Sequence, residues 1–237
     1  MRIDKFISEC GIASRKEAAR AAKAGLVTVD GQAVRDLSRH IDPEKQRVTF
    51  GGKLIEYRRF TYVMLNKPEG YVSATEDGRE KTVLELLPEE LQKRELFPCG
   101  RLDIDTVGLL ILTDDGKLAH DLLSPKHHAE KVYRFETDIR LPDDAPDIAE
   151  RGVVLDDGYE CMPARLTLDA EGTGGYITLR EGKFHQIKRM THALGAETVE
   201  LERVEFAGVK LDRVLGHGEW RELTEDEISL LERYRTE

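Results

Sequence analysis

The sequence predicts an α+β protein in which a small N-terminal unit, residues 1–59, precedes a larger unit, residues 60–237. In the larger unit, alternating strand patterns are interrupted by only a few helices, which favours a mainly antiparallel mixed sheet flanked by helices. The smaller unit instead carries the signals of two helices followed by a hairpin. With 237 residues, 40% of them hydrophobic and 35% charged, the chain can bury a core in each unit.

The two units differ in the sign of their charge. Residues 1–59 contain 13 Lys and Arg against 8 Asp and Glu, a net charge of +5, so the remainder carries −15 of the total of −10. Phosphate contacts depend on Lys and Arg, and an acidic total alone would argue against a nucleic-acid partner. The asymmetry instead predicts a basic interaction module joined to an acidic body.

Cysteine usage and hydropathy bear on the compartment. The three cysteines, Cys10, Cys99 and Cys161, are far apart, which fits a reducing environment and argues against a structural zinc site. The apolar runs are much shorter than the roughly 18–20 residues that span a bilayer, and the N-terminus lacks the apolar stretch of a signal peptide. We therefore expect a cytoplasmic protein.

The smaller unit opens with two predicted helices. The first is indicated by apolar residues at helical spacing, namely Ile3, Phe6, Ile7 and Cys10. The second begins at a capping box, in which Ser14 caps the third helical N–H and Glu17 reaches back to the cap N–H, and it ends at Gly25. Its cations lie on one side and could meet phosphates: Arg15, Lys16, Arg20 and Lys23.

A β-hairpin is predicted over residues 26–34, because Asp30-Gly31 between two apolar runs suits a primed turn. As a set, residues 2–6, 14–18 and 25–31 resemble the RNA-binding domain named after the ribosomal protein S-four. The resemblance implies binding of structured RNA, with the four helix cations as phosphate contacts. A linker is expected to end near residues 58–59.

The segment 97–116 places a charged loop between two apolar, strand-like runs, and the loop contains Arg101, Asp103 and Asp105. Burial and a nearby cation can set the ionisation of such an aspartate. In an extended loop the two carboxylates share a face, whereas a turn would separate them, so the residues alone do not choose between them. A buried Arg–Asp pair that only stabilises the loop is the structural alternative.

Together with Thr106-x-Gly108-Leu109-Leu110 and an Asp-Gly turn, Gly100-Arg101-Leu102-Asp103 resembles the catalytic motif of pseudouridine synthases that carry an S-four domain. This resemblance covers nearly the whole chain and implies isomerisation of uridine in RNA, with Asp103 as the catalytic aspartate. The reaction breaks the glycosidic C–N bond, rotates the uracil and rejoins it through carbon 5, so we expect no cofactor. Asp103 would act either as a nucleophile at the anomeric carbon or as a base at the ribose 2′ position.

The resemblance implies roles for further residues. Tyr133, in an alternating pattern over residues 130–135, would receive the flipped-out base, although a core tyrosine beside Phe135 is the simpler interpretation without the motif. Lys188 would pair with Asp103 and keep it ionised. Further contacts with RNA are expected from Arg101, Lys183 and Arg189.

Other functions are compatible with parts of the sequence. A glycoside hydrolase would use two carboxyl groups, here Asp103 and Asp105, and would release free uracil. A non-catalytic RNA-binding or ribosome-assembly factor would need only the basic unit. A metal site at the histidines is disfavoured, because adjacent histidines such as His127 and His128 rarely reach one ion.

The segment 123–133 resembles the small-subunit branch of the family most closely. This similarity predicts a synthase acting on 16S ribosomal RNA at a site of the uridine 516 type, with a uridine of 23S ribosomal RNA as the alternative. The expected partner is ribosomal RNA, either free or in an assembling small subunit. We expect a monomer that binds neither DNA nor a membrane.

Overall fold

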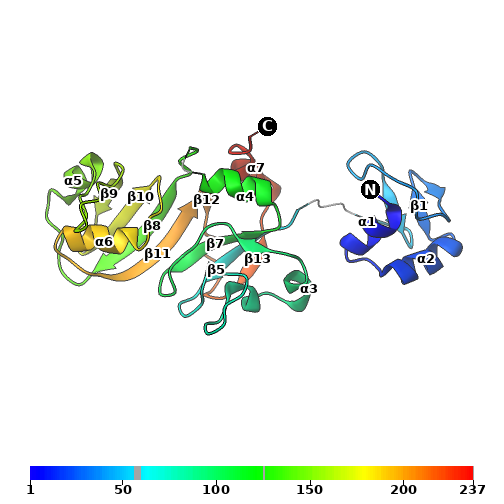
Figure 1. Cartoon of the computed structure of the whole chain (residues 1–237), viewed down its shortest axis with the longest axis horizontal. Coiled ribbons are helices and arrows are strands. Elements are labelled where there is room, and N and C mark those ends of the chain that lie inside the picture. Colours follow the sequence, from blue (N-terminus) through cyan, green and yellow to red (C-terminus); the bar gives the residue numbers. More distant parts are fainter. Residues whose placement is uncertain (56–59, 125, 237) are drawn as a thin grey trace. The chain divides into compact units, whose positions relative to one another are not determined.

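The computed structural model describes residues 1–55, 60–124 and 126–236. The chain divides into two compact units, Met1–Arg59 and Phe60–Glu237 (Figure 1). The predicted end of a linker at residues 58–59, and residue 125 of the segment that resembles the small-subunit branch, lie outside the described residues. No helix in the described part is both long and apolar enough to cross a membrane.

The first unit has two helices over a four-stranded antiparallel sheet with the order β2-β1-β3-β4. Its elements are α1 (Ile3–Glu9), α2 (Arg15–Lys23), β1 (Val27–Val29), β2 (Gln32–Ala33), β3 (Val48–Phe50) and β4 (Lys53–Leu54). The predicted two helices and hairpin are confirmed, and β3 with β4 adds a second hairpin. One apolar core joins the helices to the sheet and includes Phe6, Ala22, Val27 and Val48.

Local signals place the ends of these elements. The hydroxyl of Ser14 accepts a hydrogen bond from the Glu17 N–H at 3.3 Å, and the Glu17 carboxylate accepts from the Ser14 N–H at 2.9 Å, so the predicted capping box is present. At the hairpin, Asp30 and Gly31 have φ of 51° and 79°, as a primed turn requires. The Asp30 carboxylate also accepts from the Arg47 N–H, which ties the turn to β3.

The second unit is built on a nine-stranded sheet with the order β13-β5-β7-β11-β8-β10-β9, where β6 pairs with β7 and β12 with β11. All pairs are antiparallel except that of β7 with β11, which confirms the mainly antiparallel mixed sheet. The strands are β5 (Tyr62–Lys67), β6 (Phe97–Pro98), β7 (Val107–Thr113), β8 (Lys131–Thr137), β9 (Arg165–Leu168), β10 (Gly174–Leu179), β11 (Thr198–Phe206), β12 (Val209–Lys210) and β13 (Trp220–Glu222).

Helices cover both faces of this sheet. They are η1 (Val83–Leu86), α3 (Glu89–Gln92), α4 (Gly116–Leu123), α5 (Ala145–Arg151), α6 (Gln186–Ala193) and α7 (Glu225–Glu232). Residues of α4 and α7 share one apolar cluster with Met64, whereas residues of α5 and α6 share another with Val63 and Leu65 (Figure 1). Side chains alternate along a strand, so successive residues of β5 and β7 enter the two clusters in turn. Both strands are therefore buried on both faces, and their sequences are continuous apolar runs.

Candidate active site

The loop that carries Asp103 joins β6 to β7 and lies over a buried lysine. Lys67, at the end of β5, has no exposed surface. Its ammonium donates to the backbone carbonyls of Asp103 at 3.0 Å, Ile104 at 3.2 Å and Thr106 at 2.8 Å, and also to Pro68. Burial lowers the pKa of Lys67 to about 8. Three of these four carbonyls belong to the loop, so one buried ammonium ties the loop to the end of β5.

Two further hydrogen bonds shape the same loop. Ser73 brackets Leu102, because its hydroxyl donates to the Leu102 carbonyl and accepts from the Leu102 N–H, both at 3.0 Å. The Thr106 N–H donates to the Asp103 carbonyl at 3.1 Å and closes a turn. This turn separates the side chains of Asp103 and Asp105, which is the alternative that the sequence left open.

A glycine brings the Asp103 loop close to the middle of the sheet. Gly108, at the start of β7, has φ of 97°, and a Cβ at this position would lie 2.4 Å from the carbonyl oxygen of Arg203 on β11. Only glycine allows so close an approach of two backbones. On its other side Arg203 pairs with Tyr133 of β8, so β11 links the Asp103 loop to the predicted pocket tyrosine.

These segments surround a cavity of about 760 Å³, whose lining includes Arg101, Asp103, Tyr133, Lys183, His185 and Arg203. This volume lies within the range of about 300–1,000 Å³ that is typical of small-molecule sites. Tyr133 is 8% exposed and also belongs to the apolar cluster that contains Phe135. It therefore serves the core and the cavity wall together. The Asp103 side chain is 28% exposed.

The charge of the cavity is opposite to that of the unit that holds it. Its lining contains five Lys and Arg residues, namely Arg101, Lys131, Arg180, Lys183 and Arg203, against three acidic residues, Asp77, Asp103 and Glu181. The unit as a whole is strongly acidic. A concave site with an excess of cations inside an acidic body attracts an anionic ligand to that place.

The predicted pair of Lys188 with Asp103 is wrong. The ammonium of Lys188, in the first turn of α6, donates to both carboxylate oxygens of Asp105, at 2.6 and 2.5 Å. Of the two carboxylates in the loop, only that of Asp105 forms an ion pair with Lys188. Burial acts to raise the pKa of Asp105, but the hydrogen bond and charge of Lys188 outweigh it and hold this pKa below its usual value.

The basic group that faces Asp103 is His185. Its Nε2 lies 3.6 Å from an Asp103 carboxylate oxygen. His185 occupies the N-cap position of α6 in a left-handed conformation, with φ of 48° and ψ of 36°, and its side chain makes no capping hydrogen bond. The sequence pattern indicated no role for this residue beyond the disfavoured metal site. Within the described residues, no group of three or more His, Cys, Asp or Glu could hold a metal ion.

The other residues predicted to contact RNA differ in whether protein groups already bind their charged ends. Arg101 is exposed at the cavity and forms no ion pair within the described part of the chain. The ammonium of Lys183 lies 5.1 Å from the ring centre of Tyr159, in a cation–π contact. Arg189 does not line the cavity and pairs with the carboxylate of Asp157.

Sequence reasoning missed three of the Lys and Arg residues that line the cavity, namely Lys131, Arg180 and Arg203. Arg203 is 1% exposed; its Nε donates to the Leu109 carbonyl, and its Nη2 has no hydrogen-bond partner among the described residues. Lys131 donates to the Ala129 carbonyl at 3.0 Å, and burial lowers its pKa to about 8. In the sequence, Lys131 and Arg203 are recognisable only as cations within strand patterns. Such a pattern does not indicate that a residue lines a cavity.

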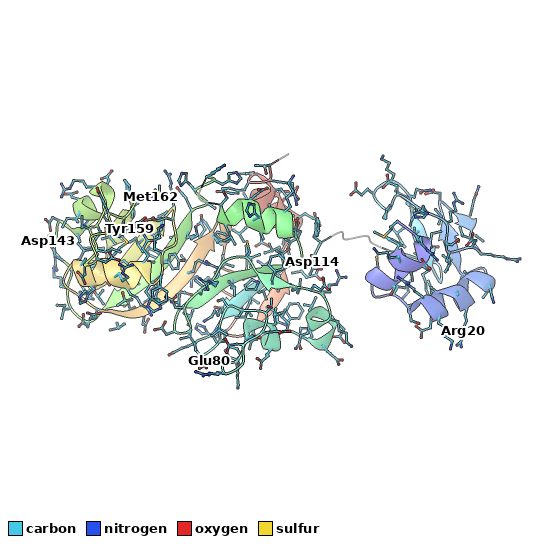
Figure 2. The ribbon with its side chains drawn as sticks, viewed as in Figure 1. Arg20, Glu80, Asp114, Asp143, Tyr159 and Met162 are labelled. Atoms are coloured by element: carbon cyan, nitrogen blue, oxygen red, sulfur yellow. The ribbon has the colours of Figure 1, made fainter. Side chains whose placement is uncertain are left out.

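In the first unit, the predicted basic residues form one exposed surface on α2. Arg15, Lys16, Arg20 and Lys23 are all exposed, and none forms an ion pair in the described residues. Figure 2 shows Arg20 pointing outward from the helix. The opposite side of the helix is buried in the core of the first unit through Ala18, Ala21 and Ala22. The helix thus packs through small residues and exposes its cations to solvent.

Comparison with known proteins agrees with this arrangement. The family described as RNA pseudouridylate synthase matches residues 61–193, and the S4 domain matches residues 1–46. The chain is 45% identical to an uncharacterized RNA pseudouridine synthase of Bacillus subtilis, over 98% of each protein. It is 40% identical to the ribosomal small subunit pseudouridine synthase A of Escherichia coli, over 97% of this chain and 99% of that protein.

Among solved structures, a pseudouridylate synthase crystal structure superposes with a TM-score of 0.69 at 35% identity, covering 98% of this chain and 99% of the other. The similarity thus extends through the basic unit and the sheet that carries the Asp103 cavity. On this evidence the chain belongs to the RNA pseudouridylate synthase family and is an isomerase that acts on RNA.

Proposed function

We propose that this protein isomerises one uridine of 16S ribosomal RNA, at a site of the uridine 516 type, with Asp103 as the catalytic carboxylate. The observation that carries the proposal is the position of that carboxylate. It is partly exposed in a cavity large enough for a nucleotide, with Tyr133 in the wall and an excess of cations around it.

The chemistry asked of the site balances without a co-reactant. The bond between the anomeric carbon and N1 breaks, the freed uracil rotates, and a bond from the anomeric carbon to carbon 5 replaces it. The proton on carbon 5 is lost and N1 gains one. Asp103 assists the first bond cleavage either by attacking the anomeric carbon or by removing the ribose 2′ proton. Both routes place one carboxylate oxygen against the ribose.

The remaining residues are assigned to holding the nucleotide. Tyr133 offers its ring to the flipped-out uracil, because an extruded base needs an apolar surface to replace its stacking partners. Arg101, which is exposed at the cavity, is assigned to fill the space that the base vacates. Lys188 acts through Asp105, by joining α6 to the loop that presents Asp103.

The choice of small-subunit RNA rests on the relatives. Curated enzymes named ribosomal small subunit pseudouridine synthase A align with nearly the whole chain at 39–40% identity. The S4 domain and the exposed α2 cations supply a second basic surface that suits a large structured RNA.

The test is release of tritium from a 16S transcript labelled at carbon 5 of its uridines. We expect release by the wild-type protein and none by Asp103→Asn, with RNA affinity within a few-fold. Asp105→Asn is the matched comparison, since it changes the neighbouring carboxylate: it loses the pair with Lys188, so release should become slower but should persist. Mapping of the modified position then identifies the uridine.

Each other result would point elsewhere. Persistent release by Asp103→Asn would exclude that residue as the catalytic group. Free uracil in the supernatant would indicate a glycoside hydrolase. Modification of a 23S transcript alone would move the substrate to the large subunit, and wild-type RNA binding without release would indicate a non-catalytic factor.

A further inference from the structure

We propose that Phe184, stacked on His185 at the cavity, is the platform on which an unpaired base beside the target uridine stacks. This inference rests on the proposed function and extends it to a neighbouring nucleotide. It gives a role to an aromatic residue that lies outside every assignment made above.

Phe184 is exposed to an unusual degree. Its side chain is 75% exposed, whereas the next most exposed aromatic side chain in the described residues, Tyr176, is 46% exposed. An apolar ring left in water at the lining of an active cavity gains free energy when a flat partner covers it. A nucleic-acid base has such a flat face, and stacking on an aromatic side chain is one of the main ways in which proteins hold unpaired bases.

One face of the Phe184 ring already stacks on the ring of His185. The centres of the Phe184 and His185 rings lie 3.8 Å apart with an angle of 18° between their planes. His185 adopts a left-handed conformation that residues with a side chain seldom occupy. Its Nε2 also lies 3.6 Å from the Asp103 carboxylate. One face of the stack is therefore next to the reacting nucleotide, and a base on Phe184 would be adjacent to it along the RNA.

The loop that presents Phe184 is braced at both ends. Glu181 accepts hydrogen bonds from the Tyr159 hydroxyl at 2.8 Å, from the Met162 N–H at 2.8 Å and from the Gln186 side-chain amide at 2.6 Å. Gln186 in turn accepts from the Lys183 N–H at 2.9 Å. Tyr159 and Met162 come from the segment between α5 and β9 (Figure 2). The exposure of Phe184 is thus imposed by a fixed loop.

The charge around the ring favours a nucleotide over an apolar peptide. Lys183, the preceding residue, lies over the ring of Tyr159 and forms no ion pair in the described part of the chain. An aromatic face beside an available ammonium matches the base and the phosphate of one nucleotide. The lining as a whole has more cations than anions. Single-stranded RNA at the edge of the target site combines these two properties.

The experiment compares Phe184→Ala, Phe184→Leu and Phe184→Tyr on the labelled 16S transcript. We expect Phe184→Ala to raise KM about 5- to 100-fold, as the loss of one stacked base implies. Phe184→Leu keeps an apolar side chain without an aromatic face and should resemble Phe184→Ala, whereas Phe184→Tyr should restore the wild-type KM. Tyr176→Ala, which removes an exposed aromatic outside the cavity lining, should leave KM unchanged.

A second measurement identifies the base. Abasic nucleotides are placed on either side of the mapped uridine. If one of those bases stacks on Phe184, its removal weakens wild-type turnover but adds little to the Phe184→Ala defect. Independent effects of the two changes would overturn the proposal, and so would a Phe184→Ala enzyme with wild-type KM. An inactive wild-type protein would instead remove the proposed function, and this inference with it. Thermal unfolding of each variant should be unchanged, because the ring is exposed.

Discussion

Lys67 illustrates how one residue can organise a site without touching the substrate. Lys67 is fully buried at the end of β5. Its ammonium is enclosed by backbone carbonyls of the Asp103 loop and of Pro68. A hydrophobic replacement of similar length would leave these oxygens buried without donors.

We expect Lys67→Met to destabilise the second unit by about 3 kcal/mol or more, because each buried polar group that loses its partner costs about 1–3 kcal/mol. Urea unfolding followed by tryptophan fluorescence measures this loss, since the only tryptophan, Trp220, lies in β13. Lys117→Met is the control: this lysine is exposed on α4 and should change stability little. Equal stability of the two variants would refute the anchoring role of Lys67.

The ion pairs at the site show what side-chain chemistry alone does not determine. Lys188 and His185 are both basic and lie three residues apart, yet they meet different carboxylates, Asp105 and Asp103. Within a helix, residues three positions apart lie on the same face. His185 precedes α6 in a left-handed conformation, so this rule does not apply to His185 and Lys188. Lys188 therefore pairs with Asp105 instead of the expected Asp103, and His185 faces Asp103.

At the scale of elements, the parallel contact of β7 with β11 depends on Gly108. This contact carries Arg203 to the cavity and orders the strands around Tyr133. The backbone of β11 occupies the space where any side chain of residue 108 would lie.

Gly108→Ala should therefore destabilise the second unit by more than about 3 kcal/mol and abolish tritium release, because the new methyl group forces β7 and β11 apart. Gly116→Ala is the matched control, since this glycine begins α4 without a positive φ, and no atom lies within 4 Å of the place that its methyl group would take. It should be neutral or slightly stabilising. Comparable unfolding midpoints for the two variants would contradict this account of β7.

Asp115 joins three elements at the start of α4. Its fully buried carboxylate caps the Leu118 N–H at 3.1 Å and accepts from the Tyr62 hydroxyl at 2.7 Å and from Arg235 at 2.6 Å. Burial acts to raise the pKa of Asp115, but the hydrogen bonds from Arg235, Tyr62 and Leu118 together lower it below its value in an unfolded chain.

A carboxyl group whose pKa is lowered by folding stabilises the protein above its unfolded pKa and loses that contribution as the pH falls through the folded value. We expect Asp115→Asn to cost about 2 kcal/mol at pH 7, through the weakened cap and the unpaired Arg235. The difference from wild type should shrink as the pH falls below about 4, where the carboxyl group of the unfolded chain begins to take up a proton. Urea unfolding of the wild type and of Asp115→Asn at pH 7 and pH 3 measures the cost and its pH dependence. The same difference in unfolding free energy at both pH values would contradict the lowered pKa of Asp115.

At the scale of the whole molecule, acidic and basic residues are concentrated in different places. The acidic excess lies in the second unit, while two local groups of cations are exposed on α2 and line the cavity around Asp103. Local concentration of cations lets a protein of net charge −10 bind a polyanion, because screening limits the reach of surface charges to about 8 Å at physiological salt.

Replacing Arg15, Lys16 and Arg20 by Gln should weaken binding of 16S RNA and reduce the slope of log affinity against log salt by about 2, since each phosphate contact contributes about 0.7–0.9. Filter binding over a salt series measures the slope. The matched control replaces three cations of the second unit that already hold carboxylates, namely Lys93, Arg140 and Arg213. An equal change of slope in both triple variants would remove α2 from the RNA-binding surface.

Much of the architecture could be predicted because its signals are local. The capping boxes at Ser14 and Thr224, the Asp30-Gly31 turn and the apolar run of β7 each depend on residues a few positions apart. The resemblance to a family named Asp103 and Tyr133 together, and the structure lines one cavity with both.

By itself, the sequence determined the two helices and first hairpin of the basic unit, the mainly antiparallel character of the acidic unit and the motif that carries Asp103, since hydrophobic pattern, capping and charge are properties of neighbouring residues. Only the tertiary structure decided that Lys188 pairs with Asp105, 83 residues away, and that His185 faces Asp103. It also placed Lys67 beneath the loop and Arg203 beside Tyr133. Such contacts depend on how strands align and where one turn points, and these follow from packing of the whole sheet.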